Sequence, residues 1–463
     1  MGRAGGVGRT LSRMDAATQP TRMYLRRVLP TPSARPNPSN NVKRRPRGAQ
    51  PFAAEHCFPH WNPGYEISHD ARPTSPLLPP GTPIVLSVIA SVLALYIVLR
   101  LVWPLRLPLA ARLFLAVLVF GMALHHRIVA QFAGTMASPE IPKMVIAVLA
   151  TGFTALLLGA LFLLLLDAAL LLARLLRSAR ATAALRARWL RPAAGLTALA
   201  LGIFGVSQGM AVPKPRSIEV EIAGLPAAFD GYRVLQLTDI HASRLLTGNW
   251  VRRVVAESNA LKPDLIVITG DLIDGTVAAR ADDFLPLGEL QAPDGVIAIT
   301  GNHEYYAQYT EWMQAFRALG MQVLENTHAE VRRGDAALTI AGVTDPVAQR
   351  YDLPQPDLAA ALQGADPQAP VILLDHRPRE AKANAARGVQ LQLSGHTHGG
   401  HIIGMDQLVK RANGGYVSGR YQVGDMTLYV SNGAGLWPGF AARIGVPSEI
   451  TLITLKAAPK ARE

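Results

Sequence analysis

Four long apolar stretches in the first half of the chain restrict its fold more than any other feature. They cover residues 84–103, 107–124, 144–173 and 194–211. About 20 apolar residues are needed to cross the hydrocarbon core of a bilayer. The alternative for each stretch is a buried core helix. Four stretches in succession, together with a positive mean hydropathy of +0.19, favour membrane-spanning helices.

The arginines between the third and fourth stretches predict how these helices cross the membrane. Residues 174–191 read RLLRSARATAALRARWLR and hold six arginines. Lys and Arg in short loops are enriched on the cytoplasmic side, and Arg interleaved with Leu, Ala and Trp suits an anionic membrane face. We therefore expect a multi-pass protein of the cell membrane in which everything after residue 211 lies outside the cytoplasm.

The basic charge of the chain is confined to its first half. Residues 1–211 carry 23 Lys and Arg against 6 Asp and Glu, whereas residues 212–463 carry 23 against 27. The C-terminal half has no basic stripe with interleaved aromatic residues, so the sequence predicts no nucleic-acid partner. The single cysteine, Cys57, excludes an intrachain disulfide and a cysteine-based metal site.

Residues 1–80 differ in composition from the rest of the chain. They are rich in Arg, Pro, Ser and Asn, a composition that buries too little apolar surface to order itself. The segment is expected to be a disordered tail. Alternatively, translation starts later than residue 1, because Met14 and Met23 lie within this segment.

After residue 212 the pattern changes to short apolar runs between Ala-rich helical segments. Eight runs are typical of strands: RSIEVEI, YRVLQLTD, DLIVITGD, GVIAITGN, ALTIAGVTD, PVILLDH, VQLQLSGH and MTLYVSNG. Strands alternating with helices predict a layered α/β domain of about 250 residues. The expected division is a tail over 1–80, a four-helix transmembrane region over 81–211 and the α/β domain over 212–463.

Candidate metal ligands follow five of these runs, at the point where each run ends. In open α/β sheets, ligands bind at the carboxyl ends of the strands. Residues two apart, as in Asp239-x-His241 and His396-x-His398, point the same way where the backbone is extended. The candidates are Asp239, His241, Asp271, Asn302, His376, His396 and His398, with His303 in addition. This oxygen and nitrogen set suits Mn, Fe, Zn, Ni or Mg, and it is large enough for two ions that share one carboxylate.

The order of these motifs resembles that of a known family. Asp-x-His, Gly-Asp, Gly-Asn-His-Glu, His and Gly-His-x-His occur in this order in calcineurin-like metallophosphoesterases, and the resemblance covers residues from about 216 to 455. The segment SNGAGLWPGFAARIGVPSEITL is similar to the membrane-associated bacterial branch, which includes Mn-dependent phosphodiesterases and some UDP-2,3-diacylglucosamine hydrolases. The resemblance implies N-terminal membrane helices followed by a four-layer α/β/β/α sandwich.

The resemblance also implies a role for each candidate residue. One metal ion would bind Asp239, His241 and His398, and the other Asn302, His376 and His396, with Asp271 bridging both. His303 would act on the substrate as a general acid or charge stabiliser. Two divalent ions, with Mn expected first, would hold a hydroxide that attacks phosphorus.

The expected function is membrane-anchored hydrolysis of a phosphodiester or pyrophosphate, with the bilayer and a phosphoester as partners. A lipid-linked substrate from lipid metabolism, such as UDP-2,3-diacylglucosamine, is one expectation. That molecule would be cytoplasmic, whereas the arginine pattern places the domain outside the cytoplasm. The alternatives are an inactive sensor or scaffold, and transport by the four helices. The intact ligand set argues against the first, and the scarcity of intramembrane charges argues against the second.

Four polar residues have roles that the sequence leaves open. Asp274 is more typical of a turn than of a residue that orients a ligand. Glu304 is expected to cap the helix that follows it. His401, where glutamine is usual in the branch, lies either beside the ligands or in a solvated loop. Asp167 of the third stretch is expected near the membrane interface.

Overall fold

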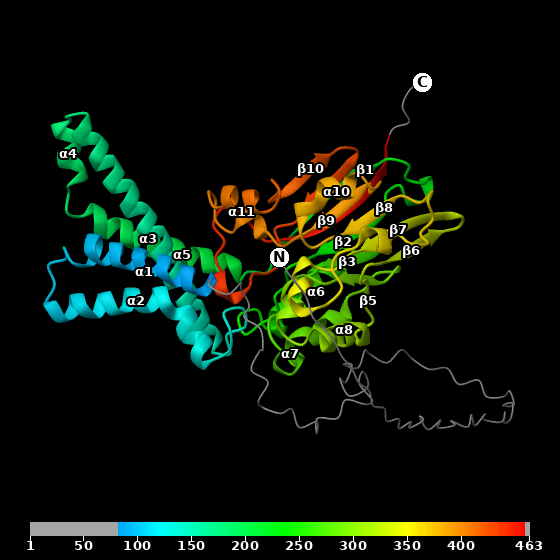
Figure 1. The fold of residues 1–463 in the computed structure, drawn as a ribbon, viewed down its shortest axis with the longest axis horizontal. Helices are drawn as coiled ribbons and strands as arrows, with labels where there is room; N and C mark the ends of the chain where they lie inside the picture. The colour runs from blue at the N-terminus through cyan, green and yellow to red at the C-terminus, as the bar shows by residue number, and fades with distance from the viewer. Residues whose placement is uncertain (1–81, 459–463) are drawn as a thin grey trace, which may run out of the picture. The chain divides into compact units, whose positions relative to one another are not determined.

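The computed structural model describes residues 82–458, which form a helical region followed by two β-sheets (Figure 1). The predicted tail over residues 1–80 lies outside the described residues, so its disorder stays a prediction.

The helical region contains four helices that are long and apolar enough to cross a membrane. They are α1 (Thr82–Ile97), which a π-helical segment extends over Val98–Val102, α2 (Leu109–Phe132), α3 (Lys143–Leu175) and α5 (Leu190–Gly209). A short helix, α4 (Ala179–Leu185), lies in the arginine-rich loop. Each long helix overlaps one of the four predicted apolar stretches.

Helix α2 continues past its predicted end at residue 124, where His125 and His126 pack against α3. The rings of His125 and His126 lie 5.3 and 5.0 Å from the ring of Phe153 in α3. The Nδ1 atom of His125 is hydrogen-bonded to the carbonyl oxygen of Met122 at 2.7 Å. These polar residues therefore continue the helix instead of ending it.

Asp167 of α3 is paired with residues of two other helices. Its carboxylate accepts hydrogen bonds of 2.7 Å from Tyr96 Oη and from Arg100 Nε, and Arg191 NH2 lies 3.4 Å away. An ionisable side chain among apolar helices is costly unless it has partners. Asp167 thus connects α1, α3 and α5.

The C-terminal region contains two six-stranded sheets. The first has the order β1 (Lys214–Ile222), β12 (Glu449–Ala457), β2 (Arg233–Leu237), β3 (Leu265–Thr269), β4 (Val296–Ile299) and β5 (Gln322–Val323). The second has the order β10 (Gly419–Val423), β11 (Met426–Val430), β9 (Leu391–Ser394), β8 (Val371–Leu374), β7 (Ala336–Gly342) and β6 (Thr327–Arg333). Strands β2, β3 and β4 run parallel to one another, as do β7, β8 and β9. The carboxyl ends within each parallel set therefore meet at one edge of its sheet.

The two sheets form the middle layers of a four-layer sandwich. Successive residues of a strand point to opposite faces: Val234 of β2 packs between the sheets, whereas Leu235 packs against helices on the outer face. The helices that cover the first sheet are α6 (Gly248–Ala260), α7 (Val277–Phe284) and α8 (Tyr309–Ala318). The second sheet is covered by α9 (Leu358–Ala361) and α10 (Ala381–Ala385). The predicted α/β/β/α order is confirmed.

The loop between α2 and α3 is hydrogen-bonded to the sandwich. Ser138 Oγ donates to the carbonyl oxygen of Asp274 at 3.1 Å. Glu140 accepts two hydrogen bonds, of 2.6 and 2.8 Å, from the guanidinium of Arg280 in α7, whose side chain is fully buried. Arg244 donates a third, of 2.9 Å.

Helix α5 contacts the sandwich through two small residues. The backbone N–H of Arg443 donates to the carbonyl oxygen of Gly205 at 2.9 Å. A Cβ atom at Gly205 would lie 2.9 Å from Ile444 Cγ1, and one at Gly209 would lie 2.6 Å from the carbonyl oxygen of Ala441. Glycine is therefore needed for the close approach of segment 441–444 to the helix.

Candidate metal centre

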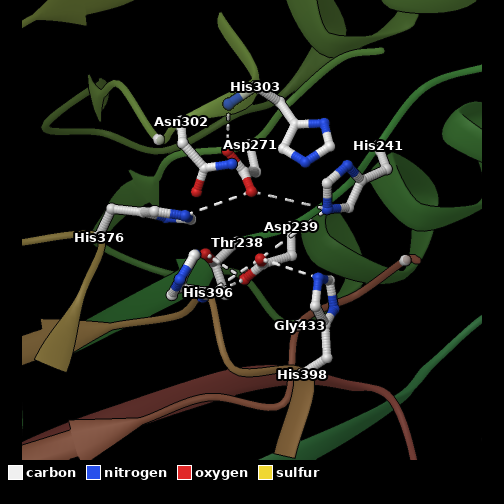
Figure 2. Close-up of polar contacts among 12 residues, drawn as sticks. Thr238, Asp239, His241, Asp271, Asn302, His303, His376, His396, His398 and Gly433 are labelled. Carbon is white, nitrogen blue, oxygen red and sulfur yellow. Dashed lines mark hydrogen bonds and ion pairs between the residues drawn. The ribbon is translucent and has the colours of Figure 1, made fainter. Parts of the chain in front are cut away.

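The structure brings all eight predicted site residues together (Figure 2). Each follows the carboxyl end of a strand: β2, β3 and β4 of the first sheet, and β8 and β9 of the second. Seven of the eight side chains are buried and the eighth, His396, is half-buried. The residues are Asp239, His241, Asp271, Asn302, His303, His376, His396 and His398.

Many of these side chains are oriented by residues whose backbone is left-handed and not extended. The backbone of Asp239-x-His241 and His396-x-His398 is not extended, because these four residues have φ between 49 and 69°. Asp271 is also left-handed, with φ of 55°. Each such residue costs about 1–3 kcal/mol and persists where the surrounding structure fixes it. The bends that follow these strands turn the side chains towards a common centre.

The first group of potential ligands consists of Asp239, His241 and His398, whose nearest ligand atoms all lie within 4.8 Å of one another. Asp239 Oδ1 lies 3.4 Å from His398 Nε2 and 3.9 Å from His241 Nε2. Thr238 Oγ1 and the backbone N–H of His396 donate to the Asp239 carboxylate. These contacts fix the carboxylate while leaving the two imidazoles facing it.

The second group consists of Asp271, His376 and His396, again with ligand atoms within 4.8 Å of one another. His376 Nδ1 is hydrogen-bonded to the carbonyl oxygen of Thr269 at 2.7 Å. This contact assigns the proton to Nδ1 and turns Nε2 towards Asp271 Oδ2, 3.2 Å away. Asn302 comes from the adjoining strand end, and its Nδ2 donates to Tyr306 Oη at 3.0 Å.

Asp271 lies between the two groups. Its Oδ2 is 3.2 Å from His376 Nε2 on one side and 3.7 Å from His241 Nε2 on the other (Figure 2). Its Oδ1 accepts from the backbone N–H of His303 at 2.9 Å. Burial opposes ionisation, but His376 and His303 outweigh it and hold the pKa of Asp271 well below its usual range. The shared residue is therefore an ionised carboxylate.

Several buried ligand atoms of the site lack a hydrogen-bond partner among the described residues. They are Nε2 of His241, Nε2 of His376 and Oδ1 of Asn302. Burying a polar atom without a partner costs about 1–3 kcal/mol. Burial, followed by the positive neighbours, also holds the pKa of His396 and His398 well below the ordinary value. Burial lowers the pKa of His376, but Asp271 outweighs burial and raises it to about 10, so His376 would release a proton when a metal binds. Neutral His396 and His398, an ionised carboxylate and an amide oxygen are suitable donors for divalent metals.

His303 lies beside the centre and is held by Asp274. Its Nδ1 is 2.5 Å from Asp274 Oδ1, and its ring lies edge-on to that of His241 at 4.5 Å. Burial lowers the pKa of His303, but Asp271 and Asp274 outweigh burial and raise it to about 9. His303 is also close enough to His241 and Asp271 to complete a third potential metal group.

Asp274 orients potential ligands, a role that the sequence favoured less than one in a turn. Its side chain is buried, and the same Oδ1 atom that contacts His303 lies 3.2 Å from His241 Nδ1. It therefore orients two imidazoles of the centre. A backbone hydrogen bond from Asp274 N to Ala242 and the contact with Ser138 place its main chain.

The expectation that Glu304 caps the following helix is wrong. Its carboxylate is fully buried and accepts from the backbone N–H groups of Gly301, Asp271 and Leu272 at 2.7, 3.2 and 2.7 Å. Burial, and then the charge of Asp271, raises its pKa to about 7. Glu304 thus ties the strand end that carries Asn302 to the one that carries Asp271.

Two further residues support the turn that carries His398. The ring of His401 lies 4.9 Å from that of His398 and 5.0 Å from that of Phe440, so His401 is packed beside a predicted ligand and does not lie in a solvated loop. Arg443 is buried and donates to the carbonyl oxygens of His398, at 3.2 Å, and Asn432, at 2.6 Å. Arg443 was not among the predicted site residues, although its segment contributed to the resemblance.

Comparison with known proteins identifies the family. A family model described as calcineurin-like phosphoesterase matches residues 232–400, a range that includes all eight site residues. A metallophosphoesterase from Campylobacter jejuni is 33% identical over 267 residues, 56% of this chain and 69% of that protein. One from Bacillus subtilis is 33% identical over 240 residues, 50% of this chain and 82% of that protein. The chain belongs to the calcineurin-like metallophosphoesterase family.

Membrane association also has a parallel among relatives of this metallophosphoesterase. A transmembrane protein with metallophosphoesterase domain from Danio rerio is 34% identical over 267 residues, 56% of this chain and 61% of that protein. The chain thus spans less than two thirds of the length of that relative. Together with the four long apolar helices, this relationship supports the predicted membrane association.

Proposed function

We propose that this metallophosphoesterase hydrolyses phosphoesters with two divalent metal ions held at the carboxyl ends of its strands. The observation that carries the proposal is the sharing of Asp271. Two groups of potential ligands meet at its buried carboxylate, and imidazole nitrogens from both groups face it without a hydrogen bond.

The two ions would divide the ligands as the resemblance implies. Asp239, His241 and His398 would hold one ion, while His376, His396 and the unpartnered Oδ1 of Asn302 would hold the other. Manganese is the first candidate, with Fe, Zn, Ni or Mg as alternatives. When bound, two such ions supply a water of lowered pKa and neutralise charge on the phosphoryl group.

His303 would act on the substrate. Its Nδ1 is engaged by Asp274, so the ring has a fixed orientation, and the raised pKa of about 9 keeps the imidazole protonated near neutral pH. A fixed cation beside the reacting phosphoryl group can donate a proton to the leaving oxygen or stabilise charge that develops on the phosphoryl oxygens.

The proposed substrate is a phosphodiester or pyrophosphate at the membrane, with a lipid-linked molecule as the specific candidate. The loop after β11 supports this choice, because it extends from the metal centre to the helical region. The ring of Trp437 lies 6.1 Å from that of His303, and the ring of Phe440 lies 6.3 Å from that of Phe153 in α3. UDP-2,3-diacylglucosamine is one such molecule and requires a cytoplasmic domain.

A substrate panel tests the proposal. The purified full chain, in detergent micelles with Mn, should hydrolyse a lipid-linked pyrophosphate or a phosphodiester faster than a soluble phosphomonoester, and a chelator should abolish all turnover. A clear preference for the monoester would refute the membrane substrate and leave the helices as an anchor. Turnover that survives complete removal of metal would refute the metal-dependent mechanism.

A further inference from the structure

Two exposed apolar side chains distinguish one short segment of the sandwich. Ile403 is 72% exposed and Leu408 is 63% exposed. All other large apolar residues of comparable exposure in residues 82–458 lie between 85 and 204, in the helical region. Leu408 belongs to α11 (Asp406–Ala412), whose last turn contains Lys410 and Arg411. Exposed apolar residues beside basic ones are typical of segments that lie in a membrane interface.

This segment is attached directly to the metal centre. It begins directly after His401, at Ile402, and is joined to the turn that carries His398. A Cβ atom at Gly400 would lie 2.5 Å from the Cα atom of Asp406, so the first turn of α11 is in backbone contact with that turn. Gly400 itself has a φ of 84°, which glycine adopts without strain.

The same segment lies at the level of the last turns of α5. The backbone N–H of Ile403 donates to the carbonyl oxygen of Ile444 at 2.9 Å, and the neighbouring Arg443 donates to Gly205 of α5. Gly205 lies four residues before the end of α5 at Gly209, which is about 6 Å along a helix. Ile203 and Phe204, next to Gly205, are 57% and 49% exposed.

We infer that segment 402–412 is a membrane-contact element, in which Ile403 and Leu408 enter the lipid interface at the end of α5. Lys410 and Arg411 would lie at the level of the lipid phosphates. The inference rests on the proposed membrane anchoring. A bilayer is the partner that fits, because residues 443 and 444 connect this segment through hydrogen bonds to α5. The apolar side chains of Ile203 and Phe204 in that helix are themselves exposed. The metal centre then opens beside the membrane surface, where a lipid-linked phosphoester would be presented.

Spin labelling of the full chain tests this contact. Cys57 is the single cysteine, so a Cys57→Ser background accepts single labels from Ile403→Cys or Leu408→Cys. Phe204→Cys serves as the lipid-facing control, and Lys382→Cys, an exposed position in α10, as the water-facing control. In nanodiscs of anionic lipid, labels at 403 and 408 should respond to apolar oxygen as the label at 204 does. The label at 382 should respond to a water-soluble nickel chelate.

Two outcomes would overturn the inference. If the labels at 403 and 408 match the label at 382 while the label at 204 is in lipid, the segment faces water although the anchoring is correct. Spin–spin broadening at 403 and 408 would show a second copy on this surface instead of lipid. If the label at 204 is in water, both the proposed membrane anchoring and this inference are wrong. Turnover of a soluble diester would still test the proposed phosphoester hydrolysis separately.

A paired substitution gives a functional test. Ile403→Ser with Leu408→Ser should keep metal content and turnover of a soluble diester, but lower turnover of a vesicle-embedded phosphodiester by about 10-fold. The matched control, Lys382→Ser with Arg387→Ser, replaces two exposed residues elsewhere in the sandwich. Equal rates on vesicles for both variants would contradict a role in membrane contact.

Discussion

Asp274 holds two imidazoles of the metal centre with a single carboxylate oxygen. Carboxylates that accept from ligating histidines fix the ring and the tautomer, and their loss typically lowers metal affinity 10- to 100-fold. We therefore expect Asp274→Ala to lower metal affinity by about this factor, measured by titrating Mn into the metal-free protein. Asp274→Asn, which keeps an acceptor oxygen, should lose less. Unchanged affinity in the alanine variant would contradict the orienting role.

A substitution of His303 distinguishes a role in metal binding from a role in the rate of the reaction. If it acts on the substrate, His303→Ala should keep both ions and lower kcat by roughly 10²–10⁴. Its proximity to His241 and Asp271 permits the opposite assignment, as a ligand. Metal content measured beside kcat decides between them, because a ligand variant would lose an ion together with activity.

At the residue scale, the sequence predicts the positions that follow strand ends and misses those that depend on tertiary contacts. Asp239 and Asp271 are recognisable because each comes directly after a buried run. Asp274 lies in a Gly-Asp-x-x-Asp-Gly context that equally suits a turn. Only the approach of His241 and His303, from two other strand ends, gives its carboxylate partners.

The contacts of the α2–α3 loop with the sandwich lead to a prediction about stability. Arg280 is fully buried and has Glu140 and Asp283 as ionic partners. Removing one partner leaves buried donors unsatisfied, which costs about 1–3 kcal/mol. Glu140→Ala should therefore lower the free energy of unfolding of the full chain in detergent by about this amount.

The matched control for this prediction is an exposed ion pair. Glu219 lies 3.9 Å from Lys456, and its side chain is 71% exposed. Surface pairs contribute little, so Glu219→Ala should leave the unfolding transition almost unchanged. Equal destabilisation by the two substitutions would show that the loop does not hold the sandwich through Arg280.

At the element scale, burial explains most, but not all, of the strands that the sequence predicted or missed. The eight predicted strands correspond to β1, β2, β3, β4, β7, β8, β9 and β11, most of which are buried apolar runs. Strands β6, β10 and β12 were not predicted. The first two form the edges of the second sheet and include exposed residues. Strand β12 is largely buried between β1 and β2, but it was not recognised as a separate run. The two-residue β5 is too short to give a pattern.

The six arginines of residues 174–191 predict the orientation of the whole molecule in the membrane. If residues 174–191 are cytoplasmic, then α5 crosses the membrane and the sandwich lies outside. Alkaline phosphatase fused after residue 463 should then be active in intact cells. An inactive phosphatase, with a fluorescent cytoplasmic reporter at the same position, would show that one of the four helices does not cross. The first candidate would be α2, which contains Arg112.

Metal analysis of the full chain tests the central claim most directly. Two ions that share Asp271 predict about two Mn per chain in the wild type by mass spectrometry. They also predict loss of metal from both positions, with loss of turnover, in Asp271→Ala, because this carboxylate lies between both ligand groups. One ion per chain in a fully active wild-type protein would contradict the account, as would an Asp271→Ala variant that keeps both ions.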